Sequence, residues 1–306
     1  MKISIVTDEV SSDLETALEI IRAWGIKYVE LRGIGDERFP EVSDYWQARV
    51  PELVHESGLS VVAVSPGLFQ APPPGVPPAP MTFSRRGDTD RVRRELEAER
   101  QRDYHINQLL PKSIEAAQRL GARTIICFTF ARMDHTEGDF ASDEIVQVLR
   151  YAAEKVAAAG LTLNIEVSEL TRRSADVCRR VNHPALGINW DPGNAFIGGE
   201  DRPYPDGFEL ARPYIRHVHF KDGLIDPISG KRAWVVDGII DWANAFADLE
   251  RDGFDGYISI ETHVRPKIES SLRCLQRLRG LLHQSSAALS REDLFRPRSL
   301  ESVFAC

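Results

Sequence analysis

Apolar residues recur along the chain in two alternating patterns. Segments with helical spacing, such as Leu14, Leu18 and Ile21, end near a glycine, as Gly25 illustrates. Between such segments lie short apolar runs that are typical of buried strands. These runs cover residues 3–6, 28–31, 60–64, 124–128, 162–165, 186–190, 215–220 and 257–260. The pattern therefore predicts eight strands, each followed by helical sequence.

Strands that alternate with helices favour parallel pairing through right-handed crossovers. Eight such units in 306 residues predict the α/β class and a single (β/α)8 TIM barrel. An open doubly wound sheet is the alternative. That fold usually carries a glycine-rich phosphate loop after an early strand, and the pattern GxGxxG is absent.

Two segments interrupt the strand–helix rhythm. Residues 66–103 form an insertion after the third strand that is first rich in proline and then highly charged. An insertion at this point lies on the active-site face of a barrel, where a lid or an oligomer contact is expected. We assign residues 1–283 to the barrel and 284–306 to a C-terminal tail that packs outside the barrel or on a neighbouring subunit.

Composition and charge limit the kinds of binding partner and the location that are expected. The formal net charge of −8 disfavours nucleic acid and acidic membrane surfaces. No apolar run is long enough to span a bilayer, and the N-terminus enters a strand pattern without a signal-peptide core, so a cytoplasmic location is expected. The four cysteines form no CxxC pair and are interpreted as ordinary thiols.

Four ionisable residues stand at the ends of the last four strands. Glu166, Asp191, His219 and Glu261 each end or follow an apolar run. In a barrel, these strand ends open into one mouth, so the four side chains are expected to converge. Three carboxylates that converge repel each other, and a divalent cation removes that repulsion. Oxygen-rich ligands with one nitrogen favour Mn²⁺, with Mg²⁺, Co²⁺ and Zn²⁺ as alternatives.

Other polar residues near the strand ends are candidates for substrate binding. Glu30 ends the second strand and Arg32 lies beyond it, while His263 follows Glu261 by two residues. The alternative for His263 is a solvated loop histidine. His135, after the fourth strand, is a weaker candidate.

The seventh strand carries alternating polar residues. Lys221 follows His219 by two residues and should face the same way. It is expected either to bind a substrate oxygen, carboxylate or phosphate, or to pair with an acid such as Glu166 or Glu261. We expect His217 to face the helix layer as a structural histidine. Trp190, beside Asp191, is expected to point into the core.

Several segments together resemble a known family. They are Asn164-Ile-Glu166, Asn189-Trp-Asp-Pro-Gly-Asn194, Arg216-His-Val-His-Phe-Lys-Asp222, Gly256-Tyr-Ile-Ser-Ile-Glu261 and Tyr28-Val-Glu-Leu-Arg32. The chain thus resembles the xylose isomerase-like sugar isomerase/epimerase superfamily over about residues 1–283, outside the insertion. That group includes ketose 3-epimerases, hydroxypyruvate isomerases, inosose dehydratases and dehydroshikimate dehydratases. The pattern is specific for the superfamily and poorly specific for the reaction.

The resemblance implies roles for individual residues. Glu166, Asp191, His219 and Glu261 would bind one divalent metal ion, and Glu166 and Glu261 would also act as the acid/base pair. The implied activity is a metal-dependent isomerase or epimerase that acts on a sugar or related polyhydroxy carbonyl compound through a metal-stabilised enediolate. Expulsion of a β-hydroxyl would instead make it a dehydratase. Asn194 departs from the epimerase pattern, in which many members carry a histidine, and remains a candidate for substrate binding through its amide.

The sequence disfavours two other function classes. Apurinic-site endonucleases share the fold, but their multi-zinc cluster needs more histidines than the strand ends here provide, and the acidic charge argues against DNA. A non-catalytic sugar-binding barrel is disfavoured because all four apparent ligands are present. The expected partner is a small polyhydroxy carbonyl substrate, and related barrels suggest a homo-oligomer.

Overall fold

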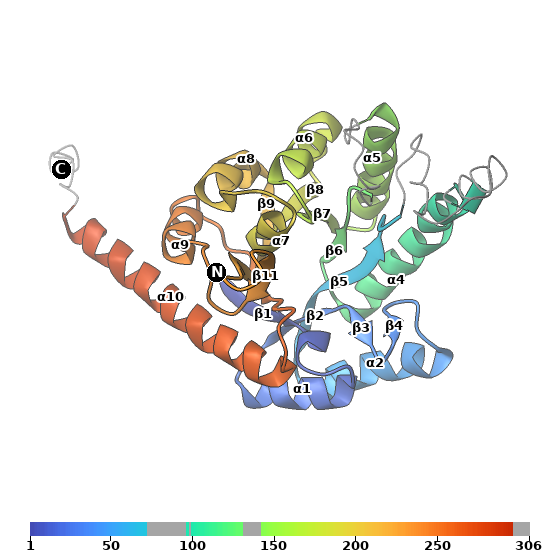
Figure 1. Cartoon of the computed structure of the whole chain (residues 1–306). Coiled ribbons are helices and arrows are strands. Elements are labelled where there is room, and N and C mark those ends of the chain that lie inside the picture. The colour runs from blue at the N-terminus through green and yellow to red at the C-terminus, as the bar shows by residue number, and fades with distance from the viewer. Residues whose placement is uncertain (72–95, 98, 131–141, 296–306) are drawn as a thin grey trace, which may run out of the picture.

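Eight parallel strands close into a barrel in a computed structural model of the chain (Figure 1). The structure describes residues 1–71, 96–97, 99–130 and 142–295, with the backbone alone over 285–295. Around the barrel the strand order is β1-β12-β9-β8-β7-β6-β5-β2. The strands are β1 Lys2–Val6, β2 Tyr28–Leu31, β5 Ser60–Leu68, β6 Thr124–Cys127, β7 Thr162–Glu166, β8 Leu186–Trp190, β9 Ile215–Phe220 and β12 Tyr257–Ile260. The predicted (β/α)8 barrel is confirmed.

Helices surround the barrel, as their amphipathic sequences require (Figure 1). Each helix packs its apolar face against the strands and exposes its polar face to solvent. The α-helices are α1 Leu14–Ala23, α2 Asp44–Ser57, α4 Leu110–Leu120, α5 Asp143–Ala158, α6 Thr171–Val181, α7 Pro192–Ile197, α8 Phe208–Ala211, α9 Trp242–Arg251 and α10 Lys267–Phe295. Shorter turns are η1 Thr7–Glu9, η2 His105–Leu109, η3 Pro203–Gly207 and η4 Arg212–Tyr214.

The layer between strands and helices forms the main hydrophobic core. Trp190 at the end of β8 shows how it packs. Its ring centroid lies 5.1 Å from that of Phe208 and 5.5 Å from that of Trp242, both at edge-on angles. Trp190 therefore points away from the mouth, as expected, while Asp191 next to it points inward.

Some predicted boundaries differ from the observed ones. The strand β5 continues to Leu68, past the expected start of the insertion at residue 66. The helix α10 runs on to Phe295 without a break at the proposed domain boundary near residue 283. Most of the insertion, the end of the tail and His135 lie outside the described residues. Over the described range, no helix is both long and apolar enough to cross a membrane.

Two short hairpins follow barrel strands and were not predicted. Strand β3 (Gly33–Ile34) pairs with β4 (Glu37–Arg38) after β2, and β10 (Asp222–Ile225) pairs with β11 (Arg232–Val235) after β9. Both lie at the C-terminal rim of the barrel, because each follows the end of a parallel strand. Strands of two to four residues carry too little periodic pattern to be recognised in a sequence.

Candidate metal centre

Four side chains converge in the barrel mouth from four adjacent strands. Glu166 is the last residue of β7, Asp191 follows β8, His219 lies near the end of β9, and Glu261 follows β12. All four are at most 5% exposed. One ligand atom from each lies within 4.8 Å of the ligand atoms of the other three. The structure thus brings together the four residues that the sequence singled out.

Three atoms of this group make no hydrogen bond although they are buried. They are Asp191 Oδ2, His219 Nδ1 and Glu261 Oε2. The Nδ1 atom lies 2.9 Å from Glu261 Oε2 and 3.6 Å from Asp191 Oδ2. Lys221 forms ion pairs with the two carboxylate oxygens, and a cation ligated by all three atoms would satisfy the whole group. The donor set therefore fits a divalent metal ion.

The imidazole of His219 is oriented from behind by Glu30. Its Nε2 lies 3.2 and 3.3 Å from the two carboxylate oxygens of Glu30, which is fully buried at the end of β2. This bond turns Nδ1 toward the mouth, in the arrangement by which carboxylates commonly support a ligating histidine. Glu30 thus supports the His219 ring, and its expected contact with substrate stays a prediction.

The expected orientation of His217 is wrong. His217 Nε2 lies 3.1 Å from Glu30 and 3.2 Å from Ser259 Oγ, so the ring faces the barrel interior rather than the helix layer. The physical reason is simple, since residues two apart on a strand point to the same side. His217 is nevertheless a buried, hydrogen-bonded structural histidine.

The ammonium group of Lys221 lies among the proposed ligands. Its Nζ is 2.9 Å from Asp191 Oδ2 and also contacts Glu261, and it donates to Asn194 Oδ1 at 3.0 Å. Of the two roles expected for Lys221, the structure shows the ion pair, with Asp191 and Glu261 as partners. A Cβ at Gly193 would lie 2.7 Å from Lys221 Cγ, so only glycine lets the lysine stem pass the start of α7.

Asn194 joins both sides of the centre. Its side-chain Nδ2 donates to Glu166 Oε1 at 3.1 Å, and its backbone N–H donates to Asp191 Oδ1 at 2.7 Å. Together with the bond from Lys221, these contacts fix the amide at the edge of the site. Asn194 is 9% exposed, and its contact with substrate stays a prediction.

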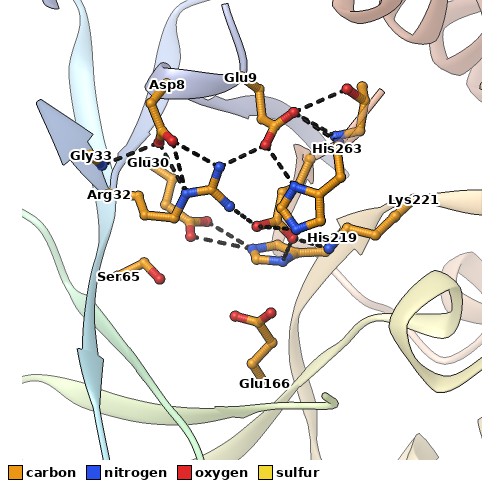
Figure 2. Close-up of polar contacts among 12 residues, drawn as sticks. Asp8, Glu9, Glu30, Arg32, Gly33, Ser65, Glu166, His219, Lys221 and His263 are labelled. Atoms are coloured by element: carbon orange, nitrogen blue, oxygen red, sulfur yellow. Dashed lines mark hydrogen bonds and ion pairs between the residues drawn. The ribbon is translucent and has the colours of Figure 1, made fainter. Parts of the chain in front are cut away.

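A second group of charges lies beside the first, around Arg32 (Figure 2). The guanidinium donates to Asp8 at 2.9–3.2 Å and to Glu9 at 2.6 Å, and it also contacts Glu261. Carboxylates thus surround Arg32, and its expected contact with substrate stays a prediction. Asp8 and Glu9 were missed, although two acids directly after the first strand were a visible signal.

His263 is fixed in this second group rather than solvated. Its backbone N–H and Nδ1 both lie 2.9 Å from the carboxylate of Glu9, and its Nε2 is 3.6 Å from Glu261. The ring centroids of His263 and of Trp234 on β11 lie 4.9 Å apart, with the rings edge-on to each other. The Trp234 ring centroid also lies 5.9 Å from Lys221 Nζ. The β10–β11 hairpin therefore brings an aromatic side chain to the mouth.

The two proposed proton carriers lie in different electrostatic surroundings. Burial and repulsion from Glu261 raise the pKa of Glu166 to about 7. For Glu261, burial acts in the same direction, but attraction from Lys221, His219 and Arg32 outweighs it and holds the pKa well below its usual range. Of the two, Glu166 is thus the carboxylate that nearby cations neutralise less.

Negative charge is in excess across the two groups. The carboxylates are Asp8, Glu9, Glu30, Glu166, Asp191 and Glu261. The fixed cations facing them are Arg32, Lys221 and, farther off, Arg38. Although burial opposes its charge, attraction from Glu30 and Glu261 raises the pKa of His219 well above its usual value. Even with His219 protonated, acids outnumber cations, and a divalent ion would reduce that excess.

The sequence pattern of the xylose isomerase-like TIM barrel family matches residues 18–278. The match covers most of the chain, and the chain belongs to this family. No curated protein sequence matches the chain as a relative.

Solved structures share the fold at low sequence identity. An L-ribulose 3-epimerase has a TM-score of 0.66 at 18% identity, covering 98% of this chain and 99% of its own. IolI, solved with a bound zinc atom, has a TM-score of 0.64 at 17% identity, with coverages of 93% and 99%. The probable 3-DHS dehydratase AsbF from Bacillus anthracis has a TM-score of 0.57 at 18% identity, with coverages of 90% and 97%. At such identities the likeness shows the fold.

Proposed function

We propose that this protein is a divalent-metal-dependent isomerase or epimerase that acts on a sugar or related polyhydroxy carbonyl compound. The observation that carries the proposal is the convergence of Glu166, Asp191, His219 and Glu261 with three buried ligand atoms lacking hydrogen bonds. The structures with a similar fold are consistent with this class of activity, since an epimerase and a protein with a bound zinc atom are among them.

A bound divalent ion would polarise a substrate carbonyl and so acidify the adjacent C–H bond. Glu166 is the best placed proton acceptor. Only Asn194 donates to it among the described residues, and no cation contacts its carboxylate. Figure 2 shows Glu166 apart from the linked residues, facing the space beneath His219. Epimerisation also needs a proton carrier on the opposite face of the substrate, and Glu261 is the candidate.

One observation favours a second candidate function, a dehydratase. Glu261 contacts both Lys221 and Arg32, and two cations make a carboxylate a poor proton acceptor. A reaction with Glu166 as the single base avoids this difficulty. After Glu166 removes the proton, loss of a β-hydroxyl as water would take that same proton back from Glu166. The fold neighbour AsbF, a probable dehydratase, is consistent with this alternative.

Metal content and turnover test the proposal together. After removal of metals with EDTA and reloading with Mn²⁺ or Mg²⁺, we expect one tightly bound ion per chain by elemental analysis. Glu166→Gln should lower turnover by about 10²–10⁴-fold, as loss of a general base does, and should weaken metal binding. Glu154→Gln, an exposed site on α5, is the matched control and should change neither. A reloaded protein without a stoichiometric ion would contradict the proposal.

The reaction type is then read by ¹H NMR in D₂O with Mg²⁺. The substrates are ketoses, inososes, hydroxypyruvate and dehydroshikimate. An epimerase incorporates deuterium at the inverted carbon and yields both epimers, an isomerase moves the carbonyl, and a dehydratase produces a new carbon–carbon double bond. Only the last result would select the second candidate.

A further inference from the structure

Arg38 is a guanidinium at the rim with an unusual set of partners. It ends the β3–β4 hairpin and reaches across to the end of β5. Nε donates to the backbone oxygen of Ser65 at 2.9 Å, Nη1 donates to Gln70 Oε1 at 3.0 Å, and Nη2 donates to Ser65 Oγ at 3.3 Å. All three acceptors are neutral.

The contrast with Arg32 shows what is missing. Arg32 contacts three carboxylates, whereas Arg38 forms no ion pair with any residue in the described part of the chain. Burial lowers the pKa of the Arg38 guanidinium, and repulsion from Arg32 lowers it further. A charge removed from water without an opposite partner is costly. A bound anion would supply the partner that Arg38 lacks among the described residues.

The geometry leaves room for such an anion. A guanidinium has five N–H groups, and three are used, so one remains on each terminal nitrogen. Two parallel N–H groups match the two oxygens of a carboxylate. A Cβ at Gly67, whose φ is +74°, would lie 3.2 Å from Arg38 Cζ. The absence of a side chain there lets the guanidinium lie close against the end of β5.

The position connects Arg38 to the metal centre. Ser65, its partner, points from β5 toward the space that Glu166 faces (Figure 2). Attraction from Glu166 and Glu261 opposes the lowering of the Arg38 pKa, in keeping with this placement. A ligand held at the centre by one end can therefore present its other end to Arg38.

We infer that Arg38, with Ser65 beside it, binds a carboxylate of the substrate, so that the substrate is a polyhydroxy carbonyl acid rather than a neutral sugar. The inference rests on the proposed function and specifies its substrate class. A carboxylate fits better than a phosphate because a single guanidinium and one hydroxyl face it in a mouth that is already rich in acids. A neutral analogue would leave the partly buried charge of Arg38 without an ionic partner among the described residues, and such sites reject analogues strongly.

Matched pairs of polyols test the inference by calorimetry on the metal-loaded full chain. The pairs are glycerate with glycerol, threonate with threitol, and gluconate with glucitol, which differ only in the carboxylate. In at least one pair, we expect the acid to bind at least about tenfold more tightly, as one charge-assisted contact provides. Arg38→Gln should reduce this preference to the level of the polyol. Arg38→Lys, which keeps the charge but loses the fork, should lose most of it.

Controls separate Arg38 from other causes. Acids also bind metals directly, so a preference that survives in Arg38→Gln would overturn the inference, as would equal binding of acid and polyol in every pair. Tighter, Arg38-dependent binding of glycerol phosphate than of glycerate would replace carboxylate by phosphate. Arg123→Gln, exposed before β6, should behave as wild type. Metal content on the same samples distinguishes a failed proposed function, with no ion bound, from a failed inference, with an ion but no acid preference.

Discussion

The two charged groups at the barrel mouth contain similar residues but differ in how completely they are paired. In the ligand group, at the ends of β7, β8, β9 and β12, three buried polar atoms lack a hydrogen bond. In the neighbouring group, the guanidinium of Arg32 contacts Asp8, Glu9 and Glu261. The atoms of Glu9, Glu261 and His263 also converge as metal ligands would, but Arg32 already neutralises them. Lys221 neutralises part of the ligand group, but no cation of the described residues contacts Glu166, so this group keeps more uncompensated negative charge than its neighbour.

Lys221→Met should have the largest effect on stability. It leaves Asp191 and Glu261 buried without their ammonium partner, which costs about 3–5 kcal/mol in unfolding free energy when no metal is present. Saturating Mg²⁺ or Mn²⁺ should stabilise this variant more than wild type, because the ion takes over the neutralisation. Urea unfolding with EDTA and with metal measures both effects.

Lys27→Met, exposed before β2, is the matched control for Lys221→Met and should unfold as wild type does. If Lys221→Met gained no more from metal than wild type gains, the ligand group would be closed like its neighbour. The comparison between the two groups would then fail.

Arg32→Met should leave the carboxylates of the second group without their cation and free to bind a metal ion. Arg32 is partly exposed, so water screens some of the loss, and we expect a cost of about 3 kcal/mol. Because Glu9, Glu261 and His263 lose their cation, metal titration by calorimetry should show a second, weaker binding event. A stoichiometry that stays at one ion per chain would show that Arg32 is not what closes this group.

Gly193→Ala should have the smallest effect. The added Cβ would lie 2.7 Å from Lys221 Cγ, and crowding of this kind costs about 1–3 kcal/mol. Gly280→Ala is the control, since no atom lies within 4 Å of a Cβ there and α10 should gain about 0.5–1 kcal/mol. Thermal unfolding of both variants should show shifts of opposite sign. Equal shifts would mean that Lys221, whose backbone carbonyl carbon also lies 2.8 Å from that Cβ, is displaced without cost.

Much of the ligand group could be predicted because it depends on local pattern. A charged residue directly after a buried apolar run is visible in the sequence, as Asp191 shows, and the barrel topology brings such ends together. The side of a strand on which a residue lies also follows from counting. The expectation for His217 overlooked this count, since a residue two positions from His219 lies on the same side of the strand and both rings face the interior.

The second group could not be predicted in the same way because it depends on pairing across the mouth. Nothing in the sequence indicates that Arg32 meets acids from η1 and from the end of β12. The position of Arg38 at the mouth could not be predicted for a further reason, since its hairpin strands are too short to show a periodic pattern. The sequence therefore identifies residues on strand ends well and residues on rim loops poorly.

The two hairpins at the rim make their strand hydrogen bonds within themselves rather than with the barrel. Arg38 and Trp234 are therefore supplied by units whose turns can change in length or composition while the barrel strands keep their register. Variation in these turns, in nature or in the laboratory, would alter the side chains at the mouth without disturbing the four proposed metal ligands. The proposed selectivity and the proposed chemistry of this protein can thus evolve separately.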